Sequence, residues 1–201
     1  MGFDLYGLNP INPNNIVKPK HFDWDDKNVT QKEKDAYYKA AEEYDEQVVG
    51  SYFRNNVWFW RPLWQYVSIG CGNILTENDI MEGSSNSGHT ISKTKAKRIA
   101  ARLRRLDKDG MLSEYDKFMN KKVKKARKNN KKVRELRDEL QKKAKKELGP
   151  DIIPADYPEP YKTEWDKIYE MEDWTGHYPF DVDNVRNFAE FCENSGGFEI
   201  C

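Results

Sequence analysis

The sequence is poor in cysteine and has no long apolar run. Cys71, Cys192 and Cys201 are its only cysteines, and no two of them form a CxxC pair. This argues against a disulfide scaffold or a four-ligand zinc site. The longest stretch without a charged residue, 62–76, is shorter than the roughly 20 apolar residues that a membrane span requires. Because residues 1–6 also lack the basic and apolar regions of a signal peptide, we expect a cytoplasmic protein with no membrane partner.

Signatures of catalysis and metal binding are missing as well. The three histidines, His21, His89 and His177, are scattered, and none lies beside an obvious nucleophile or in a His-x-x-x-His spacing. The segment 107–110, Asp-Lys-Asp-Gly, resembles part of a calcium loop but lacks the further acidic ligands and the final Glu. We therefore expect no catalytic residues, no metal site and no cofactor.

Charge is distributed very unevenly, although the net charge is zero. Residues 1–92 hold 8 basic and 13 acidic side chains, residues 93–146 hold 23 and 7, and residues 147–201 hold 3 and 14. A basic block of this size can bind nucleic acid, an acidic protein or phosphate-bearing ligands. It can equally be neutralised by the acidic end of its own chain.

Apolar periodicity and capping residues predict a mainly helical chain. Thr30 and Glu33 form a capping box at a helix start, Pro62 suits the first turn of a helix, and Ser92 can cap a third helix. Gly196 and Gly197 are expected to end the last helix. The sequence predicts helices at about 30–48, 61–70, 112–148 and 162–172, one after Ser92, one capped by Asp183, and strands at 3–8, 178–182 and 198–201.

The expected fold is α+β and mainly helical, with a compact core that has short strands near both termini and an attached basic helical hairpin. Residues 1–91 supply the N-terminal part of the core and its Trp-rich segment. Residues 92–149 form the basic hairpin, and residues 150–201 complete the core. A homo-oligomer through the basic hairpin is a further expectation.

The segment 51–64 and the loop before Ser92 contain the residues suited to a nucleotide. Guanidinium groups bind phosphate, Asn amides read a base or ribose edge, and indole rings stack on a base. Loop amides before a helix can hold an anion. The competing interpretation is that the aromatic residues simply fill the core. The candidate ligand-binding residues are Arg54, Asn55, Asn56, Trp58, Trp60, Arg61, Asn86 and His89.

The basic helices offer a second kind of site. Lysines placed along a helix neutralise phosphates and give salt-sensitive binding that is indifferent to sequence. Few aromatic residues are interleaved with these lysines in the sequence, which disfavours a platform for single strands. The alternative residues for binding nucleic acid or an acidic host protein are Lys121, Lys122, Lys124 and Lys125.

Three stretches of the sequence resemble a known group of proteins. They are the start Met-Gly-Phe-Asp-Leu-Tyr-Gly at 1–7, the run Tyr-Phe-Arg-Asn-Asn-Val-Trp-Phe-Trp-Arg-Pro-Leu-Trp at 52–64, and the end at 182–201, which closes on Gly-Gly-Phe-Glu-Ile-Cys. These stretches are similar to a family of small proteins found in bacteriophage and prophage genomes, and the resemblance covers about half of the chain. The family's cysteine pairs are absent here. The resemblance implies a phage origin and action in the bacterial cytoplasm.

Two functions follow as expectations. The first is a non-enzymatic phage counter-defence protein that sequesters a small phosphate-bearing ligand, such as a nucleotide immune signal. The alternative is an interaction protein whose basic hairpin binds nucleic acid or an acidic host protein.

Overall fold

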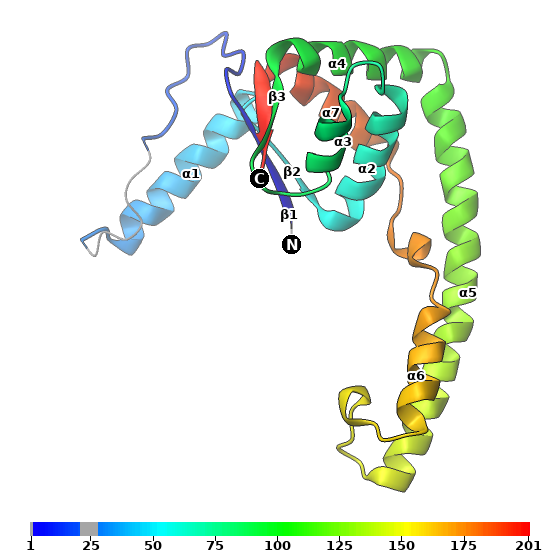
Figure 1. Cartoon of the computed structure of the whole chain (residues 1–201). Helices are drawn as coiled ribbons and strands as arrows, with labels where there is room; N and C mark the ends of the chain where they lie inside the picture. The colour runs from blue at the N-terminus through cyan, green and yellow to red at the C-terminus, as the bar shows by residue number, and fades with distance from the viewer. Residues whose placement is uncertain (1, 21–27) are drawn as a thin grey trace. The chain divides into compact units, whose positions relative to one another are not determined.

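The computed structural model describes residues 2–20 and 28–201 and divides the chain into two compact units. The first, which we call the sheet unit, comprises 1–114 and 181–201. The second, the hairpin unit, comprises 115–180. Figure 1 shows the elements of both units in chain order. The α+β, mainly helical fold expected from the sequence is confirmed, with the strands near both termini.

A four-stranded antiparallel sheet organises the sheet unit. Its strands are β1 (Gly2–Gly7), β2 (Tyr52–Asn56), β3 (His89–Ser92) and β4 (Gly197–Ile200), in the order β2-β1-β4-β3. The two ends of the chain are therefore hydrogen-bonded neighbours, with Leu5 opposite Ile200. The strands predicted at both ends are confirmed, whereas the one predicted at 178–182 is wrong. Strands β2 and β3 were not predicted, because each is short and runs directly into a helix.

Among the residues that the structure describes, the sheet unit also contains α1 (Gln31–Gln47), α2 (Val57–Gly70), α3 (Glu77–Glu82), α4 (Lys93–Lys108) and α7 (Val182–Asn194). The predicted caps at Thr30 and Ser92 are present. Helix α2 starts before the predicted position because the Asn56 side chain accepts hydrogen bonds from the backbone N–H groups of residues 58 and 59. Asp181 rather than Asp183 caps α7, since its carboxylate accepts from the amides of residues 183 and 184.

Helices α2, α4 and α7 pack on one face of the sheet (Figure 1). Side chains from this face of β1 and β4, such as Phe3 and Phe198, meet Trp60 of α2 and Phe188 of α7. The apolar stripe of α4, Ala96, Ile99, Ala100, Leu103 and Leu106, is buried throughout. The last helix ends as predicted, at a glycine pair whose φ angles are positive.

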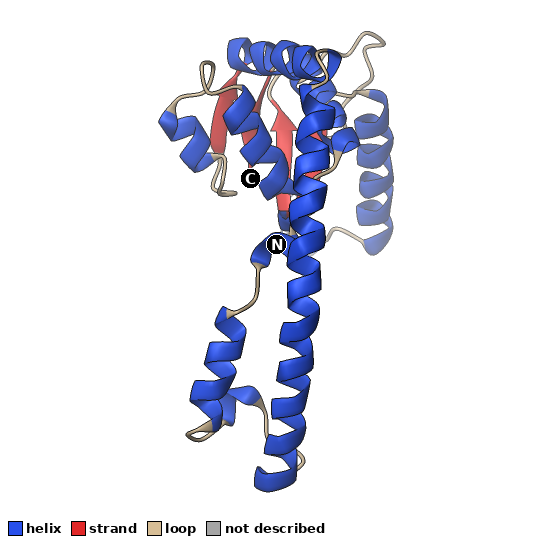
Figure 2. Cartoon of the chain, turned by 90° about the vertical axis from the view of Figure 1, so that its right-hand side faces the viewer, coloured by secondary structure: helices blue, strands red, loops and turns tan. Residues whose placement is uncertain are grey.

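The hairpin unit consists of most of α5 (Met111–Leu148) and the segment that returns along it. This segment contains α6 (Tyr161–Glu170) and two short 3₁₀ turns, η1 (Pro154–Asp156) and η2 (Trp174–His177). Figures 1 and 2 both show α6 beside α5. Val133, Leu140 and Ala144 of α5 pack against Tyr161 and Ile168 of α6 in an apolar cluster.

The side of α5 that faces this returning segment follows a heptad repeat. Buried side chains occur at residues 119, 123, 126, 130, 133, 140 and 144. Arg137 fills the gap in this series between 133 and 140, and its side chain is only 18% exposed. The steps alternate between four and three residues, which is the spacing of a coiled-coil seam. Leu136 and Leu148 of the same helix lie off this seam and are exposed.

The composition of the hairpin differs from the one expected. Residues 92–149 were expected to pair α4 with α5, but α4 belongs to the sheet unit, where it packs mainly against α7. The physical reason is that α4 has its own apolar stripe, which the core of the sheet unit buries. The acidic segment 150–180 supplies the partner of α5 instead.

Candidate nucleic-acid interface

The outward side of α5 is a continuous row of lysines. Because the seam fixes the heptad, the three positions of each repeat that point away from it can be assigned. Between residues 121 and 132 all six of these positions are lysine, and all six side chains are exposed. At 1.5 Å rise per residue they extend over about 17 Å. We call this set the lysine face: Lys121, Lys124, Lys125, Lys128, Lys131 and Lys132.

The lysine face has no ion-pair partner in the part of the chain that the structure describes. Lys122, the remaining predicted residue, lies beside this face, with its Nζ 4.4 Å from the centre of the Phe118 ring. The same side of the helix turns acidic at Glu135, Asp138 and Glu139, which bounds the row of lysines at its C-terminal end.

Several cations of α4, by contrast, have partners inside the sheet unit. Lys95 pairs with Asp79, and Arg104 pairs with Glu193. Arg102 donates from Nε to the carbonyl oxygen of Gly70 at 3.0 Å. The basic block that looks uniform in the sequence is therefore partly engaged within the sheet unit in α4.

Three of the predicted ligand-binding residues belong to the framework of the fold. Trp60 is fully buried, its ring stacks with those of Phe3 and Trp64, and its Nε1 donates to the carbonyl oxygen of Gly83 at 2.9 Å. Asn55 is 8% exposed, and its side-chain amide donates a hydrogen bond to the side-chain oxygen of Asn184 in α7. Asn56 caps α2. Trp60 is therefore a core residue rather than a base-stacking surface, because its ring is enclosed by other aromatic rings.

The other five predicted residues also belong to the sheet unit. The Arg54 Nε is 3.4 Å from a carboxylate oxygen of Asp4, and Asn86 donates to the carbonyl oxygen of Gly2. Trp58 is 41% exposed at the start of α2. Arg61 lines a hollow of about 450 Å³ between α2 and α3, and His89 contacts Asp79. Of the eight predicted residues, Trp60 and Arg61 line this hollow.

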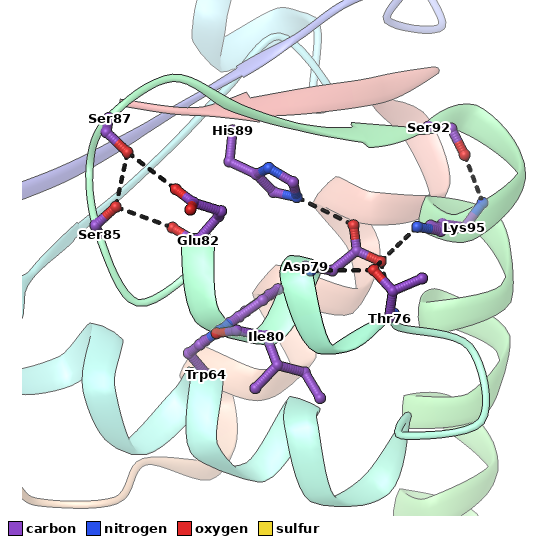
Figure 3. A network of polar contacts seen from close by, with 10 residues as sticks. All are labelled: Trp64, Thr76, Asp79, Ile80, Glu82, Ser85, Ser87, His89, Ser92 and Lys95. Carbon is purple, nitrogen blue, oxygen red and sulfur yellow. Dashed lines mark hydrogen bonds and ion pairs between the residues drawn. The ribbon is translucent and has the colours of Figure 1, made fainter.

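Asp79 is the centre of a buried polar network, drawn in Figure 3. One carboxylate oxygen lies 3.0 Å from His89 Nε2, and the other accepts from Lys95 Nζ and from the backbone N–H and hydroxyl of Thr76. Burial acts to raise the pKa of Asp79, but the hydrogen bonds from Lys95, Thr76 and His89 outweigh it and hold the pKa well below its usual value. Asp79 thus contacts side chains or backbone from the start of α3, from β3 and from α4. The network therefore joins these three elements.

Two further observations concern metal ligands and thiols among the described residues. Within residues 2–20 and 28–201, no three His, Cys, Asp or Glu side chains are grouped so that they could hold a metal ion. Burial raises the pKa of the Cys71 thiol to about 11 and also holds the pKa of Cys192 well above its ordinary value, so both thiols stay protonated near neutral pH. None of the helices among the described residues is both long and apolar enough to cross a bilayer.

Comparison with known proteins found no match to this chain among family models, curated proteins or solved structures. The phage resemblance of the two ends stays a prediction.

The lysine face was only partly visible in the sequence. Lys121, Lys124 and Lys125 were predicted from the density of charge, whereas Lys128, Lys131 and Lys132 were not singled out as site residues. The steps of four and three residues between Met119 and Ala144 were the signal that could have separated the outward lysines from Lys122.

Proposed function

We propose that the protein is a non-enzymatic nucleic-acid-binding protein that uses the lysine face of α5 to contact phosphates. The observation that supports it most directly is the unbroken set of lysines at all six outward positions of 121–132, none of them paired within the described chain. An isolated solvated helix face usually mixes charges of both signs, because adjacent like charges repel. A row of one sign therefore repels itself, and a polyanion that neutralises the lysines would remove this repulsion.

Electrostatics of this kind gives affinity without base recognition. Each neutralised phosphate releases condensed counterions, so binding is strong at low salt and weak at high salt. Nothing in the lysine face provides the paired donors and acceptors that read a base edge in the major groove. The proposed activity is therefore general binding to the backbone of DNA or RNA.

A retardation assay at low salt with a labelled 20-base-pair duplex tests this proposal. Replacing three members of the lysine face, Lys121, Lys124 and Lys128, by Gln should abolish most of the retardation. The matched control replaces three lysines on the same side of α5 beyond the acidic interruption, Lys142, Lys145 and Lys146, and should leave most of it. If the wild-type chain retards neither DNA nor RNA, the proposal is refuted, and an acidic protein becomes the partner to test.

A second candidate function, supported by a single feature, is sequestration of a small phosphate-bearing ligand, as by a phage counter-defence protein. It is supported by the hollow between α2 and α3, which Arg61, Gln65 and Ser84 line and whose size of about 450 Å³ suits a small molecule. A cognate nucleotide would raise the melting temperature of the wild-type chain but not that of Arg61→Ala. A nucleotide screen with no shift would remove this candidate.

A further inference from the structure

Aromatic and methionine side chains are exposed together where α6 ends. Tyr169 is 46% exposed, Met171 52% and Trp174 45%. The Tyr169 and Trp174 rings are in edge contact, with centroids 5.9 Å apart. We call these three residues the aromatic patch. Tyr, Trp and Met are enriched in protein–protein interfaces, so the patch has the composition of a surface that binds a protein.

The returning segment around the aromatic patch is acidic. Residues 149–180 hold 8 acidic and 2 basic side chains. Seven of the acidic side chains are exposed, and among the described residues only Asp166 of these seven forms an ion pair, with Lys162 of the same segment. We call the exposed carboxylates that lie on α6 or within three residues of its end the acidic face: Glu164, Asp166, Glu170 and Asp173.

The acidic face and the lysine face lie on opposite sides of the hairpin unit. The lysines point away from the seam of α5, whereas the returning segment covers that seam. Among the described residues no ion pair joins the two faces. The carboxylates of α6 extend over about 9 Å and the lysines over about 17 Å at 1.5 Å per residue. Each face therefore stays open within one chain and is complementary in charge to the other face of a second copy.

The loop that presents the aromatic patch is fixed to α5 by hydrogen bonds. Asn129 donates to the carbonyl oxygen of Met171 at 3.0 Å. Asn130 donates to the carbonyl oxygen of Asp173 and accepts from its N–H, each at 2.9 Å. Because the loop is held in place before a partner arrives, binding loses less conformational entropy than it would with a free loop.

We propose that the acidic face and the aromatic patch of one copy of this chain bind the lysine face of a second copy. The carboxylates pair with lysine ammonium groups, which also bind favourably over the faces of Tyr and Trp rings. The contact is head to tail, because one copy uses its acidic face and the other its lysine face. Each copy in such a pair or row keeps the opposite face for a further neighbour.

A second copy is favoured over an unrelated basic protein because every molecule already carries the complementary surface. Exposed ion pairs are individually weak and are screened by salt, so the association is reversible and salt-sensitive. It occupies the lysine face and therefore competes with the phosphates of a nucleic acid. The inference needs only the exposed lysines, so it stands or falls independently of the proposed function.

The test measures the mass of the full-length chain in solution by sedimentation equilibrium. At about 0.1 M salt the weight-average mass should exceed that of a single chain and rise with protein concentration. At about 1 M salt, where the Debye length falls from about 10 Å to about 3 Å, it should return to the mass of a single chain. A 20-base-pair duplex added at the lower salt concentration should also dissociate the copies, if the proposed function holds.

Two charge-reversed variants test which surfaces meet. The substitutions are Lys121→Glu, Lys124→Glu and Lys128→Glu in the first variant and Glu164→Lys, Asp166→Lys and Glu170→Lys in the second. Each variant alone should remain a single chain, because its two faces now carry the same sign. An equimolar mixture should associate again, since one variant supplies two acidic faces and the other two basic faces. All six side chains are exposed, so circular dichroism should show the wild-type fold in both variants.

The contribution of the aromatic patch is tested without any change of charge. Trp174→Ala should weaken the association by about two- to fivefold, the effect of losing an exposed contact between a cation and a ring. Trp58→Ala is the matched control, since Trp58 is a similarly exposed tryptophan of the sheet unit, and it should change nothing.

Three results would overturn the inference. The first is a wild-type chain that keeps the mass of a single chain at every protein concentration in low salt. The second is association that persists in the variant with lysines on α6, because another surface would then join the copies. The third is a mixture of the two folded variants that does not associate. Retardation of a duplex at protein concentrations too low for association tests the proposed function separately.

Discussion

Replacing Trp60 by alanine separates a core role from a ligand-binding role for the Trp-rich segment. Trp60 is fully buried and stacked with Phe3 and Trp64. Burial of a large aromatic side chain removes about 150–250 Å² from water, which at about 25 cal/mol per Å² corresponds to roughly 4–6 kcal/mol. Measured Trp→Ala substitutions in cores cost about 3–5 kcal/mol. The Gly83 carbonyl also loses the hydrogen bond from Trp60, so we expect a loss of at least about 4 kcal/mol.

Urea unfolding followed by circular dichroism at 222 nm measures this loss. For a chain of about 200 residues each kcal/mol lowers the melting temperature by about 2–4 °C, so the thermal midpoint should fall by about 8–16 °C. Trp58→Ala, at an exposed position two residues earlier, should stay within about 1 kcal/mol of the wild type. If Trp60→Ala is as stable as Trp58→Ala, the ring is not part of a packed core and the arrangement of α2 described above is wrong.

Three further predictions follow from the two units. Because the folded pKa of Asp79 is lowered, its ionised form stabilises the fold above the ordinary pKa of about 4, and this contribution is lost as the pH falls through the folded pKa. The stability gap between wild type and Asp79→Asn in urea unfolding should therefore be largest near pH 7 and shrink below about pH 4; a constant gap would contradict the network. Leu140→Ala should cost about 2–4 kcal/mol, whereas Leu136→Ala, which is exposed on the same helix, should cost less than about 1 kcal/mol; equal losses in chemical denaturation would refute the seam. Replacement of residues 115–180 by a short linker should leave a sheet unit that melts cooperatively. A short linker can bridge the gap because the two ends of the deleted segment lie close together, with the ring centroids of Tyr115 and Phe180 4.8 Å apart. A broad, non-cooperative melt would show that the hairpin unit completes the core of the sheet unit.

Local signals in the sequence were enough to place most helices. The capping box at Thr30, the cap at Ser92 and the glycines after α7 each act over a few residues, and each occurs as predicted. The start of α2 was misplaced because Pro62 suggests a first helical turn, whereas the Asn56 side chain begins the helix one turn earlier.

Long-range pairing could not be predicted in the same way. Strand β2 is defined by its register with β1, Leu5 opposite Phe53, and the sequence of β2 alone has no clear alternation. The partner of α5 was misidentified because charge and periodicity show that a helix needs a partner but not which segment supplies it.

The salt dependence of duplex binding tests the central claim most directly, because it counts the phosphates that the lysine face contacts. The logarithm of the affinity should fall against the logarithm of the salt concentration with a slope of about −0.9 for each phosphate neutralised, or about −5 if all six lysines take part. Replacement of Lys121, Lys124 and Lys128 by Gln should reduce the steepness of this slope by about 2.7. The same slope for wild type and variant, or a wild-type affinity that does not change with salt, would contradict a phosphate-binding role for this face of α5.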